Sequence, residues 1–326
     1  DLLKENFLKL YDSDKKKIKE KYGRFVLITT KFPKINLIKK EDNYNFLKGS
    51  IESGYIRRDN DKYYAEESVK NDLKTKEELE YFLKNIDKNF PDTKFILKPH
   101  PSESYQYWEE FSKKIKQNNL IIVPVNEYQT NAFILASDFI IASNCTTLLE
   151  AYLLKKLGIN FLPYSNSRVQ YELPKAISVN CYTTSELIDN IRSKLKIKNF
   201  DRKKLSTKEK NFLSFSIANV DQSSAHKMLD CLEKFKISDD TSDKFTIYSF
   251  LYIYKFKEFL IRILNRLKNK DLYTSNKQTY MIQKNPGFSI PEMIEVKNIL
   301  CNSLKIKKEN IIIKNLLPGL YSIEKK

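Results

Sequence analysis

Two short segments of this chain carry side chains that could hold a phosphate group. The first is Lys98-Pro99-His100-Pro101-Ser102-Glu103, in which each proline fixes its own φ and disfavours the α conformation in the residue before it. Lys98 and His100 are therefore expected to be extended, so that the imidazole could bind a phosphate or stabilise a leaving group. A stiff turn between a strand and a helix explains the hexapeptide equally well, and the segment alone does not decide.

The second segment is Ser143-Asn144-Cys145-Thr146-Thr147, followed by Glu150. Hydroxyl groups and backbone N–H groups at the start of a helix attract anions. Glu150 would lie one turn into that helix and could accept hydrogen bonds from ribose hydroxyls. Ordinary helix capping is the competing interpretation and has almost equal weight for Glu150. Phosphate binding is favoured for the Ser/Thr cluster, because the two segments follow different strands of one predicted sheet.

Several other polar residues are predicted to lie at the same edge of the sheet. Thr30, Lys31 and Asn36 belong to the loop after the first predicted strand, and Tyr164 and Ser178 to the ends of later strands. All five could contact a bound donor. A solvated loop explains the first three as well, and packing explains the other two nearly as well.

The elements that must position these residues are short apolar strands alternating with helices. Strands are predicted over 25–30, 94–98, 120–123, 138–142, 159–162 and 176–179. Helices are predicted over 1–22, 64–90, 104–118, 127–136, 146–156, 184–196, 206–216, 222–236 and 290–304. This alternation is typical of βαβ units and a parallel sheet, in which ligands bind beyond the carboxyl ends of the strands. The predicted fold class is α/β, with a Rossmann-like parallel sheet, flanking helices and a mainly helical C-terminal appendage.

Three regions follow from these elements: a connecting helix over 1–22, a Rossmann-like domain over 23–237 and an appendage over 238–326. Within the appendage, residues 244–270 combine aromatic and aliphatic side chains with Lys and Arg. A core helix with a solvated basic side is slightly favoured for this stretch. A helix at an anionic membrane surface is the alternative.

The composition limits the chemical classes of partner that the chain is expected to bind. The net charge is +17, which favours anionic partners such as nucleotides, phosphorylated lipids or nucleic acid. Nucleic acid is not expected, since the lysines are spread along the chain and no nucleic-acid-binding module is recognisable. The four cysteines lie far apart and only two histidines occur, so reduced thiols are expected and a metal site is not. No signal peptide or membrane-spanning apolar run is visible, and we expect a cytoplasmic location. Peripheral contact at the inner face of the membrane is the alternative that residues 244–270 leave open.

The order of these segments resembles the bacterial surface carbohydrate biosynthesis protein family and the related retaining β-Kdo glycosyltransferases of the GT-B type. The similarity covers roughly residues 20–235. It rests on Tyr22–Phe32, Lys98–Glu103 with Trp108, Ser143–Thr147 with Glu150-Ala151, Asn160–Pro163, Leu173-Pro174 with Ser178, and Ile217–Asn219. The chain departs from the family pattern at Thr29–Lys31, at Leu148 and at Lys155–Leu157.

The resemblance implies the C-terminal, donor-binding half of a glycosyltransferase that builds bacterial surface polysaccharide. The donor would be a CMP-activated acidic sugar, Kdo or a similar one, with His100 and the Ser143–Thr147 segment on its phosphate. No cofactor is implied, and the acceptor would be a lipid-linked glycan bound largely by an N-terminal half. Three alternatives stay open: a CDP-glycerol or CDP-ribitol phosphotransferase of the teichoic-acid type, a nucleotide-sugar epimerase, and a non-catalytic nucleotide-binding or interaction module.

Overall fold

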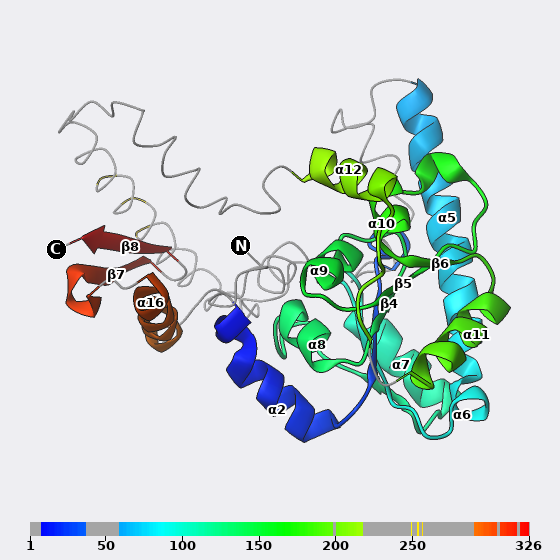
Figure 1. Cartoon of the computed structure of the whole chain (residues 1–326), viewed down its shortest axis with the longest axis horizontal. Helices are drawn as coiled ribbons and strands as arrows, with labels where there is room; N and C mark the ends of the chain where they lie inside the picture. Colours follow the sequence, from blue (N-terminus) through cyan, green and yellow to red (C-terminus); the bar gives the residue numbers. More distant parts are fainter. Residues whose placement is uncertain are drawn as a thin grey trace. The chain divides into compact units, whose positions relative to one another are not determined.

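The computed structural model describes residues 8–36, 59–197, 200–217, 249, 253, 256, 290–304, 307–317 and 320–325. The chain divides into two compact units, Leu2–Val220 and Asp221–Lys326, the second with Asp1 (Figure 1). The predictions for residues 37–58, for a helix over 222–236 and for almost all of the basic stretch 244–270 lie outside the described residues.

The first unit is built on one parallel sheet of six strands in the order β3-β2-β1-β4-β5-β6. The strands are β1 Val26–Thr29, β2 Phe95–Lys98, β3 Leu120–Ile122, β4 Ile140–Ala142, β5 Gly158–Phe161 and β6 Val179–Cys181. In the register, Thr29 pairs with Lys98, and Leu27 pairs with Ile140. The predicted α/β class with a Rossmann-like parallel sheet and flanking helices is therefore confirmed.

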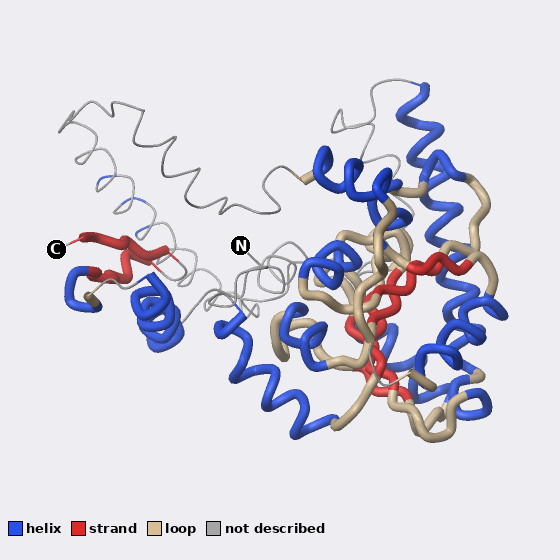
Figure 2. Tube along the Cα trace, viewed as in Figure 1, coloured by secondary structure: helices blue, strands red, loops and turns tan. Residues whose placement is uncertain are grey.

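Helices cover both faces of this sheet (Figure 1, Figure 2). Val26 and Ile28 point into a core shared with α5 Asp59–Lys84, α6 Ile86–Asn89, α7 Tyr105–Ile115 and α11 Thr184–Leu195. Leu27 points the other way, into a core shared with α2 Asp12–Tyr22, α8 Thr130–Ala136 and α9 Thr147–Leu153. The strands are mainly apolar because both faces of a parallel sheet are buried, and the polar exceptions are Thr29, Lys98, Asn160 and Asn180.

The smaller elements complete the unit. The 3-10 helix η1 Lys9–Tyr11 precedes α2, which ends at Gly23 with a φ of 72°. The 3-10 helix η2 Ser167–Val169 and the helix α10 Glu172–Ile177 lie between β5 and β6 in the chain. The helix α12 Thr207–Ser216 follows α11.

The strand predicted over 176–179 is wrong. Residues 172–177 form α10, and β6 begins at Val179. Pro174 is tolerated because it lies in the first turn of that helix, and it is buried together with Ile177, three residues further on. The apolar residues at 176 and 177, which were predicted to begin a strand, belong to the last turn of α10. Ser178 therefore precedes β6 instead of ending a strand.

The second unit contains a helix and a two-stranded antiparallel sheet. The helix α16 Ile290–Leu304 matches the prediction, and the 3-10 helix η3 Lys308–Asn310 leads into β7 Ile311–Leu317, which pairs with β8 Leu320–Lys325. The described part of this unit is thus not all helical. Within the described ranges, no helix is both long enough and apolar enough to cross a membrane.

Candidate functional site

The strand order reverses between β1 and β4, which are neighbours in the sheet. In open α/β sheets, such a switch point leaves a crevice at the carboxyl ends of the strands, because the chain leaves the two strands in opposite directions. Here the loop that begins at Thr30 and the loop that begins at Ser143 flank the crevice. These loops carry two of the groups of candidate donor contacts predicted from the sequence.

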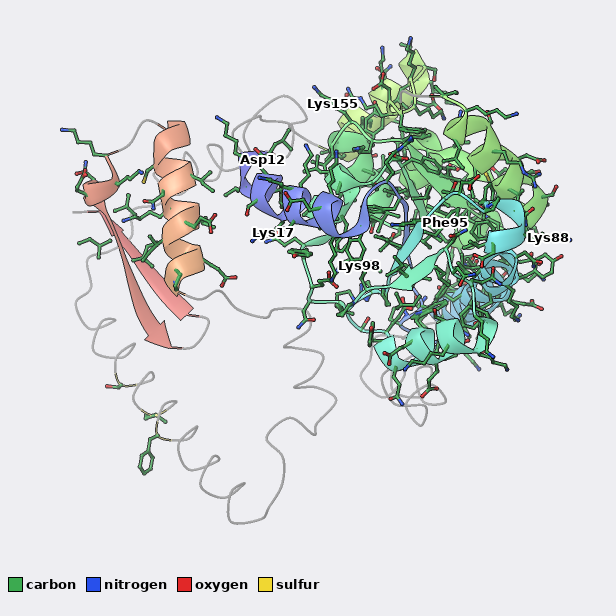
Figure 3. The ribbon with its side chains drawn as sticks, turned by 90° about the horizontal axis from the view of Figure 1, so that it is seen from below. Asp12, Lys17, Lys88, Phe95, Lys98 and Lys155 are labelled. Atoms are coloured by element: carbon green, nitrogen blue, oxygen red, sulfur yellow. The ribbon has the colours of Figure 1, made fainter. Side chains whose placement is uncertain are left out.

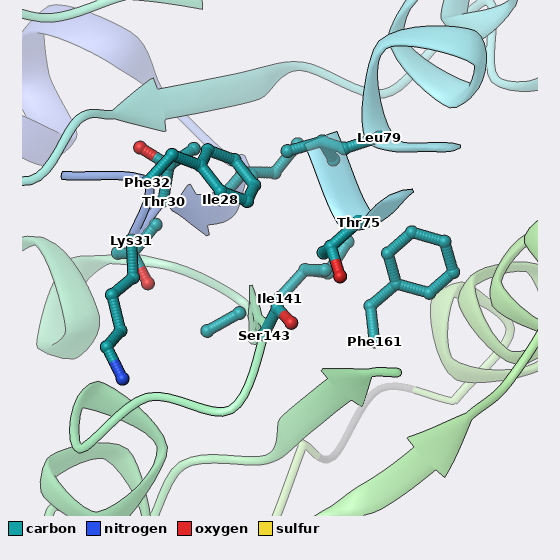
Figure 4. Close-up of a pocket in the computed structure, with 11 residues that line it drawn as sticks. Ile28, Thr30, Lys31, Phe32, Thr75, Leu79, Ile141, Ser143 and Phe161 are labelled. Atoms are coloured by element: carbon teal, nitrogen blue, oxygen red, sulfur yellow. The ribbon is translucent and has the colours of Figure 1, made fainter. Parts of the chain in front are cut away.

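Two adjoining pockets lie at this switch point and share Lys31, Phe32 and Ser143. The apolar pocket is the one in Figure 4, where the hydroxyls of Thr75 and Ser143 face the space between Lys31 and Phe161. Its other lining residues are Ile28, Thr29, Thr30, Leu79, Ile141 and Ala142. The polar pocket is lined in addition by Pro33, Lys34, Ser68, Asn71, Asp72, Asn144, Val169 and Tyr171.

Lys31 supplies a positive charge to both pockets. Its Nζ donates a hydrogen bond of 3.3 Å to the backbone oxygen of Asn144 and lies 4.5 Å from the centre of the Tyr171 ring. Neither partner is anionic, and no carboxylate of the described ranges forms a salt bridge with Lys31. The carboxyl group of Asp72 lines the polar pocket and interacts electrostatically with Lys31 at longer range. An anionic ligand would therefore meet an ammonium group that has no direct ion-pair partner among the described residues.

The hydrogen bonds of Asn144 hold the loop after β4 in place. Its backbone has a φ of 48°, its N–H donates to Asn160 Oδ1 over 2.9 Å, and its side chain bonds the backbone of Val169 and of Tyr171. These bonds join the loop after β4 to β5 and to the segment that lines the polar pocket. Asn144 was predicted to contact the donor, but its side-chain atoms already have partners. The neighbouring Ser143 lines both pockets.

The start of α9 carries Thr146 and Thr147 as predicted. Thr146 occupies the N-cap position without a side-chain capping bond and is exposed, and Thr147 Oγ1 lies 3.2 Å from Cys145 Sγ. Burial raises the pKa of Glu150 in the same helix. None of these three side chains lines the two pockets.

Lys98 is buried at the carboxyl end of β2, whose ends are marked by Phe95 and Lys98 in Figure 3. Its Nζ donates to the backbone oxygen of Val125 over 2.7 Å, and burial lowers its pKa to about 8. Lys98 therefore anchors the loop that follows β3. In the same segment, His100 Nδ1 lies 2.6 Å from Ser102 Oγ and accepts the Ser102 N–H, which leaves Nε2 as the protonated nitrogen of the neutral ring.

Glu103 is fully buried and holds the loop after β1 in place. Its carboxylate accepts hydrogen bonds from Thr30 Oγ1 (2.9 Å), the Phe32 N–H (2.7 Å), Asn36 Nδ2 (3.4 Å) and Trp108 Nε1 (2.9 Å). Burial raises its pKa, and these donors oppose the rise. Thr30, Asn36 and Glu103 were all predicted to contact the donor, and the structure brings them together, but chiefly to one another. Thr30 lines the apolar pocket, whereas Asn36 and Glu103 line neither pocket and hold the loop that forms part of its wall.

The remaining candidates lie apart from the pockets. Tyr164 donates its hydroxyl to Glu67 Oε2 over 2.8 Å and so ties its loop to α5. Ser178 lies at the amino end of β6, beside Gly158 at the start of β5, and is buried. His100 follows β2, and the pocket residue Ser143 follows β4. Because β1 lies between these two strands, about 10 Å of sheet separates the strand of His100 from that of Ser143.

One wall of the polar pocket was missed at the sequence level. Ser68, Asn71 and Asp72 line it from α5, and Thr75 lines the apolar pocket from the same helix. Their spacing is that of one helical face, so they could have been found by following polar residues, and not only apolar ones, around the predicted helix.

Comparison with known proteins adds no identification. No family model matches the chain, and no curated protein matches it.

Proposed function

We propose that this chain is the donor-binding part of a glycosyltransferase of bacterial surface-polysaccharide biosynthesis. The donor in this proposal is a CMP-activated sugar, Kdo or a similar acidic sugar, and the acceptor is a lipid-linked glycan at the inner face of the cytoplasmic membrane. One observation supports the proposal most. Lys31 and Ser143 were selected from separate segments as donor contacts, and they line the same two pockets at the switch point.

The charge of the site suits an anionic donor. Lys31 and Lys34 line the polar pocket with a single acidic residue, Asp72, and His100 follows the next strand, β2. Departure of CMP places negative charge on the leaving phosphate, and fixed positive charges or N–H donors stabilise that charge. In this proposal Lys31 binds the donor's anionic part, and His100 donates from Nε2 to the leaving phosphate.

Isothermal titration calorimetry with CMP, CDP and UDP tests the proposal. A charged hydrogen bond contributes about 1.5–3 kcal/mol, so Lys31→Ala should weaken CMP binding roughly 10- to 150-fold. His100→Ala should weaken it too. The matched control is Lys88→Ala, which removes the same charge from an exposed position of α6.

The nucleotide preference separates the alternatives. Tighter binding of CDP than of CMP would favour the phosphotransferase of the teichoic-acid type. UDP binding equal to or tighter than CMP binding would refute the CMP donor, and binding of none of the three nucleotides would leave an interaction module. Sedimentation with anionic liposomes, with and without residues 244–270, tests the membrane contact; unchanged partitioning after the deletion would refute it.

A further inference from the structure

Helix α5 buries polar side chains along the face that it turns toward the switch point. Glu67, Asn71 and Thr75 are 7%, 5% and 1% exposed, although each carries a polar group that loses water on burial. Glu67 is satisfied by Tyr164, Asn166 and Lys70. The other two are not fully satisfied, and the side chains of both line the pockets.

Three buried polar atoms around the pockets have no hydrogen-bond partner in the part of the chain that the structure describes: Asn71 Oδ1, Thr75 Oγ1 and Thr29 Oγ1. The Asn71 Nδ2 donates to Asp72 Oδ1 over 3.2 Å, so Oδ1 is the atom of this amide that is left without a partner. A buried polar atom without a partner destabilises the fold, so such atoms at a pocket indicate that a ligand supplies the missing partner.

The two sides of the polar pocket differ in hydrogen-bonding character. On the α5 side, Asn71 Oδ1 and the carboxylate of Asp72 are acceptors, and Thr75 Oγ1, which lines the adjoining apolar pocket one turn further on, can accept as well. On the loop side, the ammonium groups of Lys31 and Lys34 only donate, and Lys34 Nζ donates to Ser68 Oγ. A phosphate at neutral pH offers mainly acceptors and would satisfy the lysines alone. The acceptors of α5 require O–H or N–H groups from the ligand.

We propose that α5 is the helix that selects the sugar of the donor. Asn71, Asp72 and Thr75 bind its hydroxyl groups, and Lys31 binds the adjacent phosphate of the donor. The class of ligand is thus a polyhydroxylated sugar joined to a phosphate, the sugar part of the activated donor, with the nucleoside lying outside these contacts. This inference rests on the proposed function, since it assigns the sugar of that donor to the α5 side of the two adjoining pockets.

The test compares a CMP-sugar with CMP on variants of α5. Thr75→Val keeps the shape of the side chain and removes only its hydroxyl group, and Asn71→Leu removes the unpaired amide oxygen. For each, calorimetry measures binding of CMP-N-acetylneuraminate, of CMP and of free N-acetylneuraminate, and thermal unfolding measures Tm without ligand. The matched control is Thr207→Val, at an exposed position of α12.

Opposite effects on stability and binding are expected. Thr75→Val should raise Tm by about 2–4 °C, because an unpaired buried hydroxyl is removed. It should weaken CMP-N-acetylneuraminate binding about three- to tenfold and leave CMP binding unchanged. Asn71→Leu should weaken binding of the CMP-sugar by a similar factor, also without an effect on CMP, and Thr207→Val should change neither quantity. A side chain with only a structural role would not produce this combination.

The outcomes separate the two proposals. If CMP binds and both variants keep the wild-type preference for the CMP-sugar over CMP, the role of α5 is refuted and the proposed function stands. If no nucleotide binds, but free N-acetylneuraminate binds and Asn71→Leu abolishes that binding, the role of α5 stands and the nucleotide donor is refuted. If no probe binds the wild-type chain, both are refuted.

Discussion

Replacing Glu103 by Gln should destabilise the sheet unit by a predictable amount. The Oε1 side of the carboxylate faces Thr30 Oγ1 and the Phe32 N–H, whereas the Oε2 side faces Thr30 Oγ1, Trp108 Nε1 and Asn36 Nδ2. The NH₂ group of Gln would take the Oε1 side, where the Thr30 hydroxyl can rotate to accept. Only the Phe32 N–H then loses its acceptor.

One buried N–H without an acceptor costs about 1–3 kcal/mol, so Glu103→Gln should lower the free energy of unfolding by that amount. For a unit of this size, the corresponding fall in Tm is about 2–4 °C per kcal/mol. Glu103→Leu should cost more, because it also removes the acceptor of Trp108 Nε1, which is buried as well.

Urea unfolding followed by tryptophan fluorescence is the assay, since Trp108 is the only tryptophan in the chain and donates to Glu103. The matched control is Glu110→Gln on the exposed side of α7, which should change the free energy of unfolding by less than about 0.5 kcal/mol. Equal effects of Glu103→Gln and Glu110→Gln would refute the view that Glu103 holds the loop after β1.

Three further predictions concern other buried positions. Gly158→Ala should destabilise the unit by about 1–3 kcal/mol in urea unfolding, because the new Cβ would lie 2.9 Å from Leu148 Cδ2; wild-type stability would refute this. Burial lowers the pKa of Lys98 and of Lys156 to about 8, below the value of 10.5 for an unfolded lysine. Because the unfolded chain then binds more protons between pH 8 and 10.5, the free energy of unfolding should rise with pH in that window, and less steeply in Lys156→Met; equal slopes would contradict the assignment to Lys156. Burial also raises the pKa of Cys181 to about 12, so a disulfide reagent should label it only after unfolding; peptide mapping that finds Cys181 labelled in the folded chain would refute this.

Most of the fold could be predicted because its signal is local. Each strand of the sheet except β6 is a short apolar run bounded by polar residues, and Gly23 marks the end of α2. The beginning of β6 could not be read in this way, because Pro174 and Ile177 lie on the buried face of a short helix, a pattern that resembles a strand over so few residues.

The candidate site was predictable in place but not in the roles of its residues. The carboxyl edge of a parallel sheet follows from the βαβ pattern, and Lys31 and Ser143 do line pockets there. Whether a polar side chain faces a ligand or another part of the protein depends on contacts between distant segments. Glu103 and Asn36 are 67 residues apart in the chain and bond each other, which no local pattern indicates.

Asn144 has a consequence for mutational scanning. Its φ of 48° disfavours most side chains, and both its amide groups are used, the Nδ2 donating to Val169 O and the Oδ1 accepting from the Tyr171 N–H. Glycine would accept the backbone angle without either bond, and aspartate would lose the donor. A saturation library should therefore tolerate almost no replacement at this position, and the intolerance would report the shape of a loop and not a contact with a ligand.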